Sequence, residues 1–152
     1  MGEEKIIIGR SDKIDLPDFG ISNISAKIDT GAYTSSINCS SQKVTGKKNK
    51  TLTFKIVDSL HAEFEEYKHS TTDFSERNIK NSFEHIEKRY IIKTKILIFN
   101  KIIETEFSLS NRSNMRHPIL LGRKLLKSRF IVDVSKFNLS YKKKRKKNRK
   151  KL

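Results

Sequence analysis

Apolar and polar residues alternate along much of the first 135 residues, and this pattern predicts β-strands. The clearest case is 51–57, where Leu52, Phe54 and Ile56 share one face of a strand. Two longer runs, 89–99 and 102–109, are separated by a short turn and predict a long hairpin. Shorter runs predict strands at 4–10, 13–17, 26–28, 34–38, 119–121 and 130–134. The sequence therefore predicts an all-β domain.

Glycine, proline and polar residues predict the connections between these strands. Because Pro17 ends the second run, 4–10 and 13–17 are predicted to form a β-hairpin that opens the domain. The polar residues 40–50 predict a loop, and 61–88 shows no sustained period. Gly122 ends an apolar strand, and 123–128 is predicted to form one short helix near the C-terminus.

Composition divides the chain into a domain and a basic tail. With 152 residues, of which 35% are apolar, the chain can bury the core of one domain. After Tyr141, nine of the ten residues 142–151 are Lys or Arg, and they account for more than half of the net charge of +16. Such charges repel one another and bury no core, so 142–152 is predicted to be a disordered tail on a domain spanning 1–141. The tail suits RNA, DNA, a ribosome or an acidic polypeptide; a solubilising tail without a fixed partner is the alternative.

The sequence also indicates a cellular compartment. No apolar run is long enough to cross a membrane, and no leader segment precedes the first strand. We therefore expect a cytoplasmic protein without a membrane partner. The single cysteine, Cys39, cannot form an internal disulfide, which agrees with a reducing compartment. Cys39 is predicted to be a small buried apolar residue and not a reactive thiol.

The candidate chemistry lies in a small-residue turn after the strand 26–28. Asp29 is followed by Thr30, Gly31 and Ala32, which leave room for a substrate or a second chain close to the carboxylate. Hydrolysis by an activated water needs one group to accept a proton and another to donate one, and two adjacent carboxylates can share this work. The chain has no second Asp-Thr-Gly or Asp-Ser-Gly turn, so the second carboxylate must come from another copy. The alternative is that Asp29 only stabilises the turn.

Two segments, in this order, resemble the retropepsins. Residues 29–32, preceded by an apolar strand, match their active-site turn, and 119–126 resembles their apolar-Gly-Arg segment that leads into a short helix. The wider pattern resembles the bacterial and archaeal retropepsin-like family long labelled putative ATP-dependent zinc protease. Its matching pieces are 8–10, 26–37, a strand after Arg89, 108–112 with Met115, 118–123 and 132–133.

The resemblance implies a retropepsin-like acid-protease barrel and a homodimeric aspartic peptidase. Asp29 would be catalytic, Thr30 would bond to its twin across the dimer axis, and 119–122 would support the turn from beneath. A flap over the cleft would fall within 61–88. The residues of the active-site turn, besides Asp29, would be Thr30, Gly31, Ala32, Thr34 and Ser35.

The resemblance also implies a substrate class. Arg112 and Arg123 match positions where the family carries arginine, and either side chain could bind a substrate carboxylate or pair with an acid inside the fold. The family is associated with ATP-grasp glutamate ligases, which implies a peptide substrate that is rich in glutamate or glutamylated. The basic surface favours such an acidic chain.

The residues do not support the zinc and ATP in the family label. His61, His69 and His85 stand eight and sixteen residues apart and lack the close spacing of zinc ligands. No glycine-rich phosphate-binding motif is present. We therefore predict neither a metal nor a cofactor. The rival function is a non-catalytic retropepsin-like module that its basic tail docks on nucleic acid or ribosomes.

Overall fold

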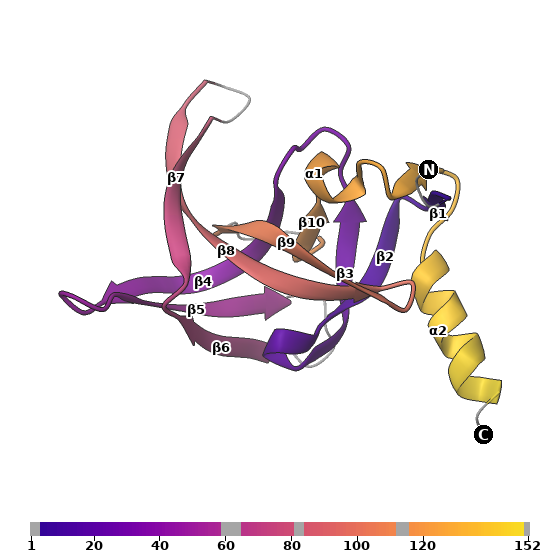
Figure 1. The fold of residues 1–152 in the computed structure, drawn as a ribbon, viewed down its shortest axis with the longest axis horizontal. Helices are drawn as coiled ribbons and strands as arrows, with labels where there is room; N and C mark the ends of the chain where they lie inside the picture. The colour runs from indigo at the N-terminus through magenta and orange to yellow at the C-terminus, as the bar shows by residue number, and fades with distance from the viewer. Residues whose placement is uncertain (1–3, 59–64, 81–83, 112–115, 151–152) are drawn as a thin grey trace.

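The computed structural model describes residues 4–58, 65–80, 84–111 and 116–150, which form a closed β-barrel with additional strands and helices around it (Figure 1). Six strands make up the barrel. In spatial order they are β10 (Ile119–Leu121), β3 (Ile21–Ile28), β2 (Ser11–Leu16), β8 (Ile86–Ile98), β9 (Lys101–Ser110) and β4 (Ser35–Thr45). Strand β10 pairs with both β3 and β4 and so closes the barrel. The predicted all-β, retropepsin-like barrel is confirmed.

Further elements extend the barrel. Strands β5 (Thr51–Asp58) and β6 (Glu65–Thr71) continue the sheet beyond β4, and β7 (Phe74–Lys80) pairs with β8 in a hairpin that projects from the barrel (Figure 1). Strands β1 (Ile6–Ile8) and β11 (Phe130–Val132) form a separate parallel pair. The helices are the one-turn η1 (Pro17–Phe19), the short α1 (Arg123–Leu126) and α2 (Leu139–Lys150). No helix among the described residues is long and apolar enough to cross a membrane.

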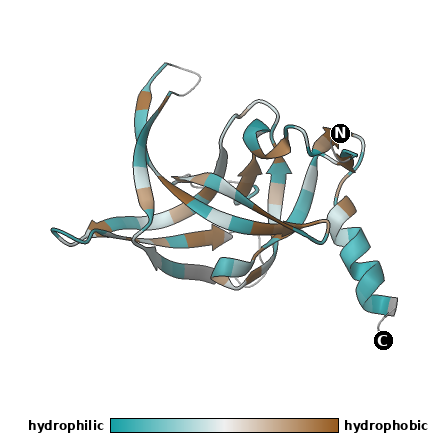
Figure 2. Ribbon diagram, in the orientation of Figure 1, coloured by the Kyte–Doolittle hydropathy of each residue, from teal (hydrophilic) through white to brown (hydrophobic). Residues whose placement is uncertain are grey.

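The apolar residues of the alternating pattern contribute to one hydrophobic core. Leu52, Phe54 and Ile56 are fully buried, as the alternation in 51–57 predicts, and the long hairpin predicted from 89 to 109 is β8 and β9. Brown and teal residues accordingly alternate along these strands (Figure 2). Cys39 also lies in the core, where burial raises the pKa of its thiol, so the prediction of a buried apolar residue is confirmed.

The predicted opening hairpin is wrong. Strand β1 pairs in parallel with β11, near the other end of the chain, while β2 pairs with β3. The run of three isoleucines at 6–8 predicts a strand that needs apolar neighbours, but it does not say which strand supplies them. The 40–50 loop is also shorter than predicted, because β4 continues through polar residues to Thr45. Strands β6 and β7 occupy much of the region predicted to lack a regular period.

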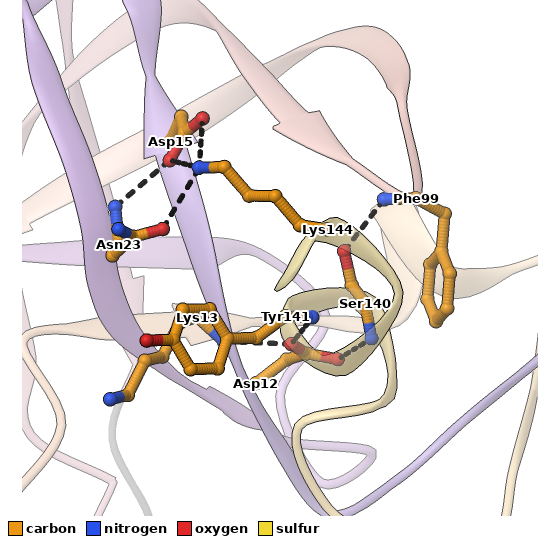
Figure 3. Close-up of polar contacts among 8 residues, drawn as sticks. All are labelled: Asp12, Lys13, Asp15, Asn23, Phe99, Ser140, Tyr141 and Lys144. Atoms are coloured by element: carbon orange, nitrogen blue, oxygen red, sulfur yellow. Dashed lines mark hydrogen bonds and ion pairs between the residues drawn. The ribbon is translucent and has the colours of Figure 1, made fainter. Parts of the chain in front are cut away.

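Residues 142–150 continue helix α2, where the sequence predicts a disordered tail. The acid Asp12 on β2 is buried, and its carboxylate accepts the N–H groups of Ser140 at 2.9 Å and Tyr141 at 3.1 Å (Figure 3). Ser140 in turn accepts the N–H of Phe99 at 2.8 Å, and Lys144 Nζ lies 2.9–3.0 Å from both oxygens of Asp15. Anchoring of the first turns therefore offsets the repulsion that favours disorder.

Candidate active site

Asp29 lies directly after β3, at the start of the turn that leads into β4. Its backbone N–H donates to the carbonyl of Leu121 at 2.9 Å, which extends the parallel pairing of β3 with β10 by one residue. Because β10 also pairs with β4, this short strand lies between the two strands that flank the turn. The apolar segment thus fixes the position of the candidate catalytic residue through backbone hydrogen bonds.

Helix α1 holds the other half of the turn. The N–H groups of Arg123 and Lys124 donate to the carbonyls of Ala32 and Tyr33 at 2.8 and 3.0 Å. Behind the turn, the buried Ser35 accepts the N–H of Gly122 on its hydroxyl at 3.0 Å. These contacts place the segment 119–124 beneath the turn, as the resemblance to retropepsins implies.

The Asp29 side chain is half-buried and lies at the surface of the chain. Its Oδ1 accepts the N–H of Gly31 at 3.0 Å, while Thr30 and Gly31 are exposed. Gly31 does not adopt the left-handed conformation. Its role is spatial: a Cβ at this position would lie 3.3 Å from Asp29 Oδ1. The turn therefore presents a carboxylate beside a small, open backbone.

Only one of the two candidate arginines can be placed. Arg123 is exposed, and its guanidinium donates to the carbonyl of Thr30 at 2.9 Å and lies over the ring of Tyr33. This contact stabilises the turn. Within the described part of the chain, Arg123 forms no ion pair with an acid. Arg112 lies outside the described residues.

Tyr33, with 58% of its surface exposed, is a candidate contact residue that the sequence patterns did not single out. Its position, as an aromatic residue within a turn of small residues, could have indicated this role.

A single chain supplies one carboxylate to this turn. The described hydrogen bonds and ion pairs join Asp29 to no second acid. Across residues 4–58, 65–80, 84–111 and 116–150, no group of three or more His, Cys, Asp or Glu residues could hold a metal ion. His69 packs against the rings of Phe19 and Phe54, where burial lowers its pKa, and His61 lies outside the described residues. Asp29 thus stands, among the described contacts, as a single carboxylate at this turn.

Comparison with known families agrees with this geometry. A model of the RimB-like family, described as the retropepsin-like aspartic endopeptidase RimB, matches residues 7–143. The chain belongs to this family. The match includes the Asp29 turn, the segment beneath it and the first turn of α2. The domain that carries the candidate site is thus the part that defines the family.

Curated relatives of this RimB-like chain are longer proteins. A probable alpha-L-glutamate ligase from Shewanella halifaxensis is 31% identical over 136 residues, which are 89% of this chain and 30% of that protein. One from Desulfotalea psychrophila is 32% identical over 130 residues, or 85% of this chain and 28% of that protein. The chain therefore spans less than a third of the length of these relatives.

A solved structure shows the same fold. The crystal structure of a Legionella pneumophila protein of unknown function has a TM-score of 0.68 and 24% sequence identity, and the match covers 90% of this chain and 99% of that one. At this identity the likeness concerns the fold of the RimB-like domain alone.

The turn of the RimB-like domain depends on a glycine beneath it. A Cβ at Gly122 would lie 2.7 Å from the carbonyl oxygen of Tyr33 and 2.9 Å from that of Ala32. We therefore expect Gly122→Ala to push the turn away from α1 and to lower the free energy of unfolding in urea by about 2 kcal/mol. Lys127→Ala, an exposed position just after α1, is the control and should change it by less than about 0.5 kcal/mol. Equal stability of the two variants would show that the turn is not held as described.

Proposed function

We propose that this chain is an aspartic endopeptidase that acts as a homodimer. The observation that carries the proposal is the Asp29 turn: one surface carboxylate per chain, fixed by backbone hydrogen bonds to the segment beneath it, in a member of a retropepsin-like endopeptidase family. Two such turns facing each other would bring two carboxylates together. We place the enzyme in the cytoplasm, where a reducing environment suits the single buried thiol of Cys39.

The proposed reaction divides proton transfer between the two copies of Asp29. At a separation of about 3 Å, two carboxylates share one proton, because both cannot be ionised together. The ionised copy takes a proton from water, which attacks the peptide carbonyl, while the protonated copy polarises the carbonyl oxygen. The protonated copy of Asp29 then donates a proton to the leaving amine. The exposed Thr30 would bond to its twin and hold the two acids in register.

We propose a substrate that is rich in glutamate or glutamylated. The chain carries a net charge of +16, which attracts acidic peptides, and Arg123 lies exposed beside the turn. Relatives named probable alpha-L-glutamate ligases contain a region similar to this chain within a longer protein, which supports a functional link to a glutamate ligase. Such a ligase would supply the bonds that this peptidase hydrolyses.

Mass in solution and cleavage test the proposal together. We expect a dimer in moderate salt that cleaves a peptide ending in a run of glutamates faster than the matched glutamine peptide. Thr30→Val should weaken the dimer and the cleavage in parallel, because it removes the hydroxyl that bridges the copies. A strict monomer that still cleaves would overturn the shared site. Equal cleavage of the two peptides would overturn the acidic specificity and leave the peptidase assignment standing.

A further inference from the structure

Helix α2 presents a dense array of positive charge on an element other than those that build the Asp29 turn. Its sequence contains no acidic residue, so the cations have no partner of opposite charge within the helix. Lys144 is the half-buried member and is bound to Asp15 on β2. The exposed cationic side chains are Lys142, Lys143, Arg145, Lys146, Lys147 and Arg149. Helix α2 is accordingly teal over most of its length (Figure 2).

The spacing of these six cations matches a nucleic acid duplex. At about 100° per residue they cover an arc of about 200° around the helix, and at about 1.5 Å per residue they span about 10 Å along it. The array therefore carries roughly one exposed charge per 2 Å, close to the phosphate spacing of about 1.7 Å along a DNA duplex. The C-terminal half of α2 projects away from the barrel (Figure 1), while Lys142 and Lys143 near its base lie over the rings of Phe137 and Phe99.

The array is held rigidly at its base. Asp12, Ser140 and the Lys144–Asp15 pair fix the first turns of α2 against β2 and the β8–β9 turn (Figure 3). A cationic helix that is already formed loses less conformational entropy on binding than a disordered tail would.

The shape of the array distinguishes between polyanions. A membrane-surface helix needs an apolar face, and 142–150 has no apolar residue. An extended acidic peptide would contact one narrow stripe and leave most of the arc unpaired. The major groove of B-form DNA, about 12 Å wide, admits an α-helix and has phosphates along both edges. The A-form RNA major groove is too narrow and deep for a helix of this diameter.

We propose that α2 inserts into the major groove of double-stranded DNA and contacts the phosphates on both sides without reading the base sequence. The array consists mainly of lysine, which binds phosphate as a point charge, and this favours sequence-independent contacts. This binding activity is separate from the proposed peptidase function.

Two variants with equal charge change test the proposal in the full-length protein. The first, R145Q/K146Q/R149Q, removes three cations from α2; the second, K47Q/K48Q/K50Q, removes three exposed lysines from the β4–β5 loop. Binding to a labelled DNA duplex is measured over a range of salt concentrations. We expect the α2 variant to lose more than tenfold in affinity at about 100 mM salt and its log–log salt slope to fall by about 2.7, while the loop variant changes the slope by less than one.

Circular dichroism verifies that both variants are folded before binding is compared. Equal losses in the two variants would show that net charge alone attracts DNA and would overturn the proposal. An RNA duplex that binds as tightly as DNA of the same length would overturn insertion into the major groove. Displacement of DNA by poly-glutamate at equal concentration of charge would assign α2 to an acidic polypeptide. Tighter binding of the DNA duplex than of both competitors supports the proposal.

Discussion

Replacing Asp29 with Asn is expected to reduce peptide hydrolysis by at least about a thousandfold. The change removes the general base from one copy and the general acid from the other, and each role contributes about a hundredfold or more. The amide is nearly isosteric with the carboxylate, and its oxygen can still accept the Gly31 N–H that Asp29 accepts at 3.0 Å. The fold and the dimer should therefore persist, and initial rates on a glutamate-rich peptide measure the loss.

Asp133 provides a matched control for this experiment. Its Oδ1 accepts the N–H of Ser135 at 3.0 Å, two residues further along, as Asp29 does with Gly31. If Asp29 merely stabilises its turn, Asp29→Asn and Asp133→Asn should have similarly small effects on activity. A large loss confined to Asp29→Asn separates catalysis from turn stabilisation. If the chain is instead a non-catalytic module, the wild-type protein hydrolyses no peptide, and neither substitution can lower the rate.

Mixing wild-type and Asp29→Asn chains tests whether the two carboxylates are shared. At equal concentrations, only about one quarter of randomly assorted dimers contain two wild-type chains. Activity should therefore fall to about a quarter of that of the wild type at the same total concentration. Activity that falls only to one half would mean that each chain works alone.

Local patterns were enough to predict most of the barrel strands and the candidate turn. The alternation in 51–57 directly reports which residues face the core, and the apolar runs of β8 and β9 report the long hairpin. The turn was predictable because its small residues and its glycine are contiguous in sequence. The Ile119–Leu121 strand beneath it lies far along the chain, and only the resemblance to retropepsins placed it there. In such segments the side-chain period and the turn chemistry agree with the final structure.

Pairing over long sequence distances was not predictable from the same patterns. Residues 6–8 are all isoleucine, and such an apolar run predicts a strand whether its partner is β2 or β11. The prediction of disorder was wrong for 142–150 because composition shows the repulsion among the cations. It does not show the buried acid on β2 that holds the helix N-terminus. Arg123 likewise lies beside the predicted turn, but its contact with the Thr30 carbonyl depends on the way α1 folds back.

Replacing Asp12 with Ala is expected to release α2 from the barrel. Asp12 is 1% exposed, and its carboxylate accepts the N–H groups of Lys13, Ser140 and Tyr141. Burial raises the pKa of Asp12, and these hydrogen bonds oppose that rise because they favour the ionised form. Removing the acceptor leaves the first-turn N–H groups of α2 unpaired, one of them buried, at a cost of about 3 kcal/mol. Urea unfolding and the helical signal in circular dichroism should both decrease.

Asp15→Ala on the same strand is the matched control. It breaks the ion pair of Lys144 with Asp15, which is 2.9 Å long and in which the Lys144 side chain is 37% exposed. Ion pairs with that much exposure contribute about 1 kcal/mol or less, so α2 should remain helical. Comparable losses in both variants would mean that charge attraction to Lys144 holds the helix, and not the buried cap. A loss confined to Asp12→Ala would show that one internal carboxylate converts a self-repelling basic segment into a docked helix.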